Sequence, residues 1–292
     1  MVQPMASSRV DLDAARRLML HELEVQVTAG RELRDLGDGW LLHDPVDPEP
    51  YWNRLVGPAW PGDEGRFARR LDEVITLFAS LDRIAHIRPL PIGNEPPDLA
   101  ARLLANGFEQ LAADVRMVLV DRAPSERLAA AFSTGRATAG RWAIARFPDG
   151  AGRPAGGALG RGPWASEASL VLMEAFGVDP LRRPLLEGDL LASVLRAGCS
   201  ILVLYDDGEP VATARRTTVG GATYLSSIGT RPTWRGRGLG ALVTALAVVD
   251  ADSDPRHLVH LVVDVSNVGG RRLYERLGFV TVGEPVPDLL AL

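Results

Sequence analysis

The 292-residue sequence has a single cysteine, Cys199, and no lysine, so that all 32 of its basic residues are arginines. One cysteine excludes an internal disulfide bond and a metal cluster held by cysteines. Cys199 directly precedes an apolar strand-like run, which indicates a buried structural thiol rather than a reactive one. The five histidines are scattered without the spacing of metal ligands, so we expect no metal site.

Long apolar runs are absent as well. No run approaches the roughly 18 residues that a membrane-spanning helix needs, and the first residues, which include Asp11 and Asp13, lack the apolar segment of a signal peptide. A net charge of -5 argues against nucleic acid as a partner. We therefore expect a cytoplasmic protein that binds neither membranes nor nucleic acid. Its length suffices for two ordinary domains, each with its own core.

A glycine-rich turn is the most informative stretch of the chain, because it stands between a predicted strand at Tyr224 to Thr230 and a predicted helix at Ala241 to Val249. The turn reads Arg235-Gly236-Arg237-Gly238-Leu239-Gly240. The first N–H groups of a helix have no partner within it and carry partial positive charge. Glycines let a phosphate approach these groups closely, and neighbouring arginines add charge. The turn therefore predicts a site for a phosphate-bearing ligand.

A second motif follows the first and makes the pattern specific. A predicted strand at Leu261 to Asp264 leads to Asn267, and the next helix ends in Leu273-Tyr274-Glu275-Arg276-Leu277-Gly278-Phe279. The two motifs together resemble the GNAT superfamily of acyl-CoA-dependent N-acetyltransferases. Its signature is Arg/Gln-x-x-Gly-x-Gly/Ala, then a strand, then Asn and a helix ending in Leu-Tyr-x-x-Leu-Gly-Phe. The resemblance covers about residues 224 to 280.

The resemblance implies acetyl-CoA as co-substrate, with its pyrophosphate over the amides of Gly236 to Gly240 and with Arg235 and Arg237 beside it. In the family, the strand before the turn bulges and separates from its neighbour, and the pantetheine arm lies against it like an extra strand. This places Ile228, Gly229 and Thr230 against the arm. Asn267 would bind the arm too, although capping of the helix that it begins also explains an Asn here.

Tyr274 lies seven residues after Asn267, almost two helical turns further along the same face. The resemblance makes it the acid that protonates the departing thiolate of coenzyme A. A phenol suits this role because its pKa lies above that of the thiol. Many family members carry a Glu five residues before the Asn as base, and here that position is Val262. Three bases stay open: Asp264, Glu174 in the predicted helical region on the acceptor side, and a chain of water molecules.

The first half of the chain repeats the order of elements in the second half. Superposing Gly107-Phe108 on Gly278-Phe279 gives an offset of 278 − 107 = 171 residues. The helix-like segment Glu64 to Ala79 then falls on the helix of the glycine turn, but the acidic Glu64 falls on Arg235. An acid at that place repels a phosphate. We therefore interpret the first half as a degenerate copy, with chance similarity of a Leu/Ala-rich helix followed by Gly-Phe as the other explanation.

The predicted fold is α/β, with two tandem GNAT-like domains that each have a mixed, mostly antiparallel sheet flanked by helices. Residues 1–124 form the degenerate domain and residues 125–292 the acyl-CoA-binding catalytic domain. The region from Arg122 to Gly140 reads as a break with at most a short helix, and Asp149 to Gly162 as a loop. The remaining elements of the second half are strands at Trp142 to Phe147 and Ile201 to Tyr205, a broken helical region at Ser166 to Leu195, and paired strands at Pro210 to Val219 and Ala222 to Thr230.

The function that the sequence favours is transfer of an acetyl group from acetyl-CoA to a primary amine of a small molecule or peptide, by direct attack in a ternary complex. Mycothiol synthases are tandem family members of this size, so a reaction like theirs is one subclass. The absent Glu leaves an alternative, an acyl-CoA-binding regulatory protein without turnover. A nucleotide-binding module is weaker, because the turn lacks the Lys-Ser/Thr end of a P-loop. The first half would serve as scaffold, substrate wall or homodimer surface.

Overall fold

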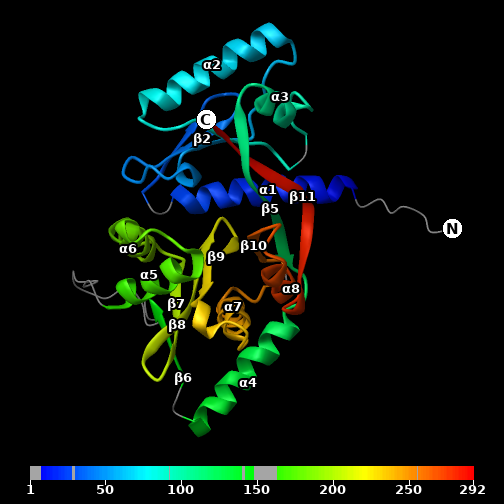
Figure 1. Ribbon diagram of the computed structural model, residues 1–292. Coiled ribbons are helices and arrows are strands. Elements are labelled where there is room, and N and C mark those ends of the chain that lie inside the picture. Colours follow the sequence, from blue (N-terminus) through cyan, green and yellow to red (C-terminus); the bar gives the residue numbers. More distant parts are fainter. Residues whose placement is uncertain (1–7, 28–29, 92, 140–141, 148–162, 255) are drawn as a thin grey trace, which may run out of the picture. The chain divides into compact units, whose positions relative to one another are not determined.

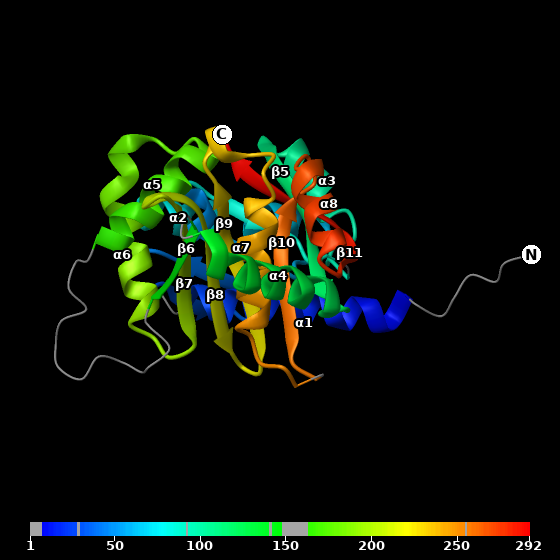
Figure 2. The same cartoon turned by 90° about the horizontal axis from the view of Figure 1, so that it is seen from below.

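The computed structural model describes residues 8–27, 30–91, 93–139, 142–147, 163–254 and 256–292 (Figures 1 and 2). Contacts group the chain into two compact units. Unit 1 contains Met1–Arg116, Val263–Asn267 and Thr281–Leu292, and unit 2 contains Met117–Val262 and Val268–Val280. The loop predicted at Asp149 to Gly162 lies outside the described residues.

Unit 1 is built around strands in the order β1-β2-β3-β4-β11-β5, of which β3 and β4 are parallel. Strands β5 and β11 continue into unit 2. The elements are α1 (Ser8–Val27), β1 (Glu32–Asp35), β2 (Trp40–His43), β3 (Arg54–Val56), α2 (Glu64–Ser80), β4 (His86–Arg88), α3 (Leu99–Ala105), β5 (Phe108–Leu119) and β11 (Phe279–Ala291).

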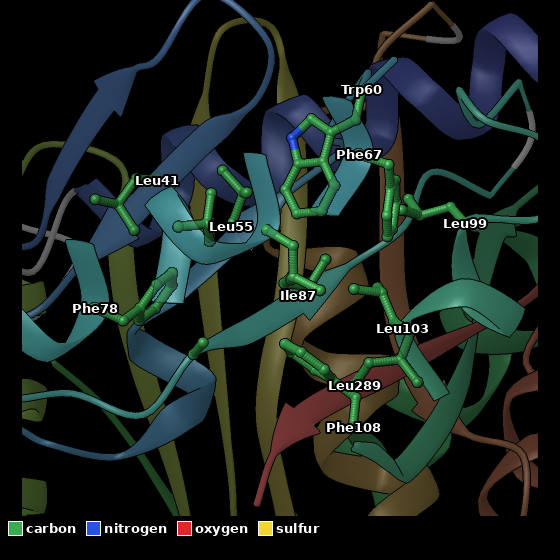
Figure 3. Packing of buried hydrophobic residues seen from close by; sticks show 13 residues of the cluster. Leu41, Leu55, Trp60, Phe67, Phe78, Ile87, Leu99, Leu103, Phe108 and Leu289 are labelled. Atoms are coloured by element: carbon green, nitrogen blue, oxygen red, sulfur yellow. The ribbon is translucent and has the colours of Figure 1, made fainter. Parts of the chain in front are cut away.

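An apolar core lies under α2 and α3 (Figure 3). Helix α2 presents Phe67 and Phe78 to it, and the Phe67 ring packs edge-on against Trp60 with their centroids 5.5 Å apart. Ile87 from β4 and Leu289 from β11 lie in the same cluster. Because Leu289 pairs with Ile87 across the strands, the C-terminal residues of the chain complete the core of the unit that contains its N-terminal residues.

The opposite face of the same sheet carries buried charges. Side chains alternate along a strand, so Arg54 lies on the face opposite Leu55. Helix α1 covers this face with Glu22, whose carboxylate accepts hydrogen bonds at 2.8 Å from Arg54 and Arg116. Both Glu22 and Arg54 are only 1% exposed. The Tyr51 hydroxyl donates to Glu22 as well, at 3.2 Å, and the Arg54 guanidinium stacks on the Tyr51 ring.

Asp288 of β11 joins this network from the other end of the chain. Its carboxylate accepts a 2.7 Å bond from Arg88 and a 3.0 Å bond from His86, and Arg88 also bonds to Asp114. The second ring nitrogen of His86 donates to the Pro50 carbonyl at 2.7 Å. The charges of unit 1 are therefore paired deep inside it, and they tie β11 to the strands of the first half.

Unit 2 follows the predicted order of elements closely. Its strands run in the order β10-β9-β8-β7-β6, with β9 and β10 parallel and the other pairs antiparallel, so the predicted mixed sheet is confirmed. The elements are α4 (Ala123–Ala139), β6 (Trp142–Phe147), α5 (Pro163–Phe176), α6 (Arg183–Val194), β7 (Cys199–Asp206), β8 (Glu209–Val219), β9 (Ala222–Thr230), α7 (Leu239–Val249), β10 (Leu258–Asp264) and α8 (Val268–Arg276).

Helices cover both faces of the unit 2 sheet. On one face, α5 and α6 bury an apolar cluster over β7 that includes Trp164, Leu190 and Ile201. On the other face lies α7, which is buried from Leu242 to Val248, and α4 packs on α7 (Figure 2). The expectation of a break near residues 122–140 was wrong on this point, because α4 is longer than predicted. Its Ala-rich sequence is stabilised by packing rather than by a strong apolar stripe.

The start of α4 holds the C-terminal ends of two other helices. Arg122 donates to the Val248, Ala251 and Asp252 carbonyls at 2.8 to 3.2 Å, which satisfies acceptors left open at the end of α7. The Ser125 hydroxyl donates to the Leu277 carbonyl after α8 at 3.0 Å. Among the helices that the structure describes, none has both the length and the apolar character needed to cross a bilayer.

Substituting Glu22→Gln tests the charged face of unit 1. Burial would raise the pKa of the Glu22 carboxyl, but Arg116, Arg54 and Arg88 outweigh burial and lower it to about 2 from 4.5. Glu22 therefore stabilises the fold fully above pH 4.5, and this contribution is lost as the pH falls from 4.5 towards 2. We expect the variant to lose about 3–5 kcal/mol of unfolding free energy at pH 7, because two buried arginines lose their partner.

Urea unfolding at pH 7 and at decreasing pH measures both effects, and the difference between wild type and variant should shrink on acidification. The control is Glu24→Gln, two residues further along α1 and exposed, which should change the unfolding free energy by less than about 0.5 kcal/mol. A difference that stays constant with pH would show that the Glu22 charge is not what matters.

Candidate functional site

Strand β9 leaves its neighbour β10 halfway along its length. The parallel pairing runs from Ala222 with Leu258 to Leu225 with Leu261 and ends there, although β9 continues to Thr230. On its other side β9 stays paired with β8 as far as Thr230. The backbone of residues 226–230 therefore has an edge without a β10 partner, which we call the free edge of β9. The separation of this strand from its neighbour was predicted.

A bulge lies at the beginning of the free edge. Arg215 of β8 pairs with Ser226 and Thr213 pairs with Gly229, so two residues of β9 stand opposite the single Ala214. The extra residue is accommodated at Ser227, whose φ of 50° is in the left-handed region that a non-glycine residue rarely adopts. The predicted bulge is confirmed. Sequence reasoning did not identify Ser227, although the Ser226-Ser227 pair interrupts an otherwise apolar strand.

The glycine turn (Arg235 to Gly240) leads from β9 into α7 and leaves the start of this helix open. Gly238 occupies the N-cap position with φ 78°, and no side chain of the described residues caps the helix. The first intrahelical bond runs from the Leu242 amide to the Gly238 carbonyl at 3.0 Å, so the amides of Leu239, Gly240 and Ala241 have no partner within the helix. A Cβ atom on Gly236 or Gly238 would meet nothing within 4 Å.

Three elements of unit 2 converge at Gly240. A Cβ atom at this position would lie 3.3 Å from the Thr230 hydroxyl oxygen at the end of β9 and 3.4 Å from a methyl group of Leu273 on α8. The close approach explains a glycine here, because any side chain would push the three elements apart. The structure thus brings together Thr230, the glycine turn and the helix that carries Tyr274.

The two arginines of the glycine turn make different contacts. Arg235 donates to the Ala175 carbonyl at the end of α5 at 2.7 Å and to the Thr230 carbonyl at 3.3 Å. Its side chain therefore joins the last turn of α5 to the end of β9. The Arg237 guanidinium lies 4.6 Å from the centre of the Trp234 ring and is exposed at the surface.

A second clamp holds α5 in the same place. Arg231 bonds to both carboxylate oxygens of Glu174, at 2.8 and 3.1 Å, and to Glu209 at 2.9 Å. The last turn of α5 then lies against Gly229, where a Cβ would be 3.0 Å from the Ala175 Cβ. Sequence reasoning missed Arg231. Since both oxygens of Glu174 accept bonds from one guanidinium, this carboxylate already has a structural partner.

Tyr274 is buried on α8, 8% exposed, with its ring edge-on to Phe279 at a centroid distance of 6.1 Å. Burial raises the pKa of its phenol to about 12, because the phenolate would be poorly solvated there. The group therefore stays protonated at any physiological pH. Val262, at the end of the unit 2 part of β10, is half-buried and carries no titratable group.

Asn267 and Asp264 belong to unit 1 by their contacts and form the turn that precedes α8 in the chain. The Asn267 amide donates to the Asp264 carbonyl at 3.0 Å, and one carboxylate oxygen of Asp264 accepts from the Ser266 amide at 2.7 Å. Asn267 is exposed and Asp264 half-buried. In the described part of the chain, no three His, Cys, Asp or Glu side chains come together as metal ligands would.

Helix α2, which the offset of 171 residues aligns with α7, begins differently. Asp63 is the N-cap of α2, and its carboxylate accepts a 2.9 Å bond from the Arg66 amide. This side chain occupies the place where an anion would bind at a helix start. The N-terminal end of α2 is thus capped by a side chain, whereas that of α7 is uncapped.

Residues 170–279 match the statistical model of the acetyltransferase (GNAT) family. This region is therefore a GNAT acetyltransferase domain, and the prediction that the protein is an acyltransferase is confirmed. The matched residues include β9, the glycine turn, α7, β10 and α8. No curated protein matches the sequence significantly.

Solved structures are similar to this chain over most of its length. A GCN5-related N-acetyltransferase from Kribbella flavida shares 22% identity, with a TM-score of 0.63 over 95% of each chain. Another, from Sphaerobacter thermophilus, shares 18% with a TM-score of 0.53 over 88% of this chain and 81% of its own. A tandem GNAT protein from the clavulanic acid biosynthesis pathway shares 16% with a TM-score of 0.51 over 99% and 97%. These similarities show a GNAT-like mixed α/β fold.

The left-handed glycine of the turn gives a stability test with opposite signs at two sites. Gly238→Ala should lower the free energy of unfolding by about 1–2 kcal/mol, because φ 78° is strained for any residue with a Cβ. Gly188→Ala, in the exposed middle of α6, should raise it by about 0.5–1 kcal/mol. Urea unfolding of both variants measures the pair. Equal signs would contradict the conformation that we describe for Gly238.

Proposed function

We propose that the chain transfers an acetyl group from acetyl-CoA to a primary amine of a small molecule or peptide, by direct attack in a ternary complex. The observation that carries the proposal is the uncapped start of α7 beside the free edge of β9. A diphosphate fits the first feature and an extended amide chain fits the second. Coenzyme A contains both parts, joined in that order. The match of residues 170–279 to an acetyltransferase family supports the same assignment.

The pyrophosphate would accept hydrogen bonds from the amides of Gly236 to Gly240. Positive φ at Gly236 and Gly238 leaves the backbone on that side open to a ligand. Arg237 is exposed and adds charge for the phosphates. Because Arg235 already donates to two carbonyls, we assign it to shaping the turn, and its effect on the phosphates comes through the position of the backbone.

The pantetheine arm would lie along Ile228, Gly229 and Thr230. Its amides pair with the free edge of β9, as an added strand would. The bulge at Ser227 turns main-chain groups of this segment away from the regular ladder. An N–H of the Ile228 segment then polarises the thioester carbonyl and stabilises the oxyanion of the tetrahedral intermediate. Asn267 would add a side-chain contact to the arm.

Proton transfers complete the reaction. The amine attacks the thioester carbon, the tetrahedral intermediate collapses, and Tyr274 protonates the coenzyme A thiolate as it leaves. A phenol with a pKa near 12 is protonated before this step at neutral pH. For the base, both oxygens of Glu174 accept from Arg231, and one oxygen of Asp264 accepts from the Ser266 amide. We therefore favour a water molecule that accepts the proton from an amine of modest pKa.

The first half, residues 1–124, is in our proposal a degenerate GNAT-like domain, and residues 125–292 form the catalytic domain. Asp63 at the start of α2 supports this, because a carboxylate already fills the anion position there. Such a domain serves as scaffold, substrate wall or homodimer surface. The absence of a titratable group at Val262 favours a second candidate function, binding of acyl-CoA without turnover.

Calorimetry separates these proposals from a general nucleotide site. We expect acetyl-CoA to bind with a dissociation constant in the micromolar range, typical of enzyme co-substrates, and ATP and NAD to bind far more weakly. A thiol reagent then follows coenzyme A release over a panel of amines. Binding without release for any amine favours the regulatory candidate. If acetyl-CoA does not bind, or binds no better than ATP, the proposal is wrong.

Tyr274→Phe tests the acid. We expect turnover to fall about 100-fold or more while the affinity for acetyl-CoA is unchanged, because the variant keeps the ring and removes only the proton donor. Tyr205→Phe is the matched control, since that phenol also has a raised pKa but bonds to Glu167 on another part of unit 2. Ionisation of Tyr274 should not reduce wild-type turnover at neutral or moderately alkaline pH, because the pKa of its phenol is about 12, and any rise of turnover with pH should follow the pKa of the acceptor amine. Unchanged turnover in Tyr274→Phe would exclude the residue from the mechanism.

A further inference from the structure

Arg215 of β8 is a buried cation that the proposed mechanism does not use. It is 5% exposed and lies under α6. Its Nη1 group donates to the Asp189 carboxylate at 2.7 Å and to the Ser193 hydroxyl at 3.1 Å, both on α6. Its Nε group donates to the Ser226 hydroxyl of β9 at 3.0 Å. Burial would lower the pKa of the guanidinium, but Asp189 outweighs it and the pKa is raised.

The place of this cluster in the sheet points to a ligand. Ser226 pairs with Arg215 across the strands and is the first residue of β9 beyond its pairing with β10. The cluster therefore lies at the point where β9 stops pairing with β10, which is where the free edge of β9 begins and where the acyl group would bind. It is on the face of the sheet that α5 and α6 cover, whereas the glycine turn opens into α7 on the other face.

Arg215 and Ser226 still have hydrogens to donate. Ser226 uses its oxygen to accept from Arg215, so its own hydrogen points to another partner. The three hydrogen bonds above involve the Nε and Nη1 groups of Arg215, and no residue in the described part of the chain accepts from Nη2. The Nη2 group of Arg215 and the hydroxyl of Ser226 are thus two neighbouring donors, one of them on a cation, at the beginning of the free edge of β9. A carboxylate is the group that such a pair recognises.

We propose that Arg215 and Ser226 bind a carboxylate of the acceptor, so that the acceptor is an amino acid or a similar amine with an acidic group. The proposal rests on the acyl transfer proposed above. Ile228, where the thioester carbonyl would lie, is two positions after Ser226, which corresponds to at most about 6–7 Å along the strand. The amine and the carboxylate of the acceptor would therefore be a few bonds apart. Asp189 orients Arg215 and does not touch the substrate.

Matched pairs of acceptors test the charge directly. Coenzyme A release is measured with glycine, β-alanine and 4-aminobutanoate, each compared with its carboxamide, which has the same amine and nearly the same shape without the charge. We expect at least one of the acids to be used about 10- to 100-fold more efficiently, in kcat/KM, than its amide. The amine of an amide is the less basic one and is less protonated at neutral pH, so amine reactivity alone would favour the amide.

Variants assign the preference to Arg215. Arg215→Gln should reduce the ratio of acid to amide to near one, and because acid and amide are compared in the same variant, this ratio does not depend on any change in acetyl-CoA affinity. The double variant Arg215→Gln, Asp189→Asn removes both charges, avoids an unpaired carboxylate, and should lose the preference in the same way. The matched control is Arg216→Gln, the next residue of β8, which faces the other side of the sheet and bonds to Ser200. It should keep the wild-type ratio.

Asp189→Asn alone distinguishes substrate binding from a structural role. With its own acid neutralised, Arg215 attracts the substrate carboxylate more strongly, so KM for the acid should fall while kcat changes little. If Arg215 and Asp189 only hold α6 on the sheet, Asp189→Asn should lower the free energy of unfolding and leave the KM for the acid unchanged.

Each outcome has a defined meaning. Equal use of acids and amides, or an acid preference that survives Arg215→Gln, overturns the carboxylate site. Transfer to other amines but to none of these acids overturns it as well and leaves the proposed acetyl transfer intact. Binding of acetyl-CoA without transfer to any amine overturns both the acceptor assignment and turnover. An acid preference that disappears with Arg215 and strengthens with Asp189→Asn supports the proposal.

Discussion

The site depends on one constraint, namely that β9 stays hydrogen-bonded to β8 along its whole length but leaves β10 after Leu225. A regular ladder cannot do both, and the bulge at Ser227 absorbs the difference at the cost of a left-handed residue. Side chains on both sides of the bulge fix it. Arg215 holds Ser226 before it, and Arg231 and Arg235 hold α5 against the residues after it. Three arginines therefore hold the segments on both sides of the strained residue Ser227.

The helices α2 and α7 show how one residue decides whether a helix start is available to a ligand. Both follow a loop and both are packed on a sheet. Asp63 caps α2 with its own carboxylate, which stabilises the helix and neutralises its positive end. Gly238 provides α7 with the turn that it needs and no oxygen. The stability that a capping side chain would contribute is forgone at α7, where Arg122 and the interior of unit 2 hold the rest of the helix in place.

The order of elements in the second half could be predicted from the sequence, because the apolar run of β7, the glycine turn and the Asn267 motif are local signals. The bulge came from family resemblance. The resemblance did not predict that Ser227 is the residue at the centre of the bulge, since two serines in a strand are compatible with either register. The roles of Arg215, Arg231 and Arg235 were not predictable either. Their partners lie 26, 57 and 60 residues away in the sequence. The sequence pattern alone does not distinguish an arginine that is paired in the fold from one that is exposed to solvent. Helix α4 was underestimated because its stability comes from α7.

Strand β11 has a consequence for how the chain is made. Leu289 fills the apolar core of unit 1, and on the other face of the sheet Asp288 bonds to Arg88 and His86. During translation, the residues up to Arg116 leave the ribosome long before these partners exist. Until then, Asp114 is the acidic partner of Arg88 in the nascent first half, and the sheet lacks its fifth strand in the order β1-β2-β3-β4-β11. The core of unit 1 is therefore completed only after residues 170–279, which match the acetyltransferase family, have been synthesised.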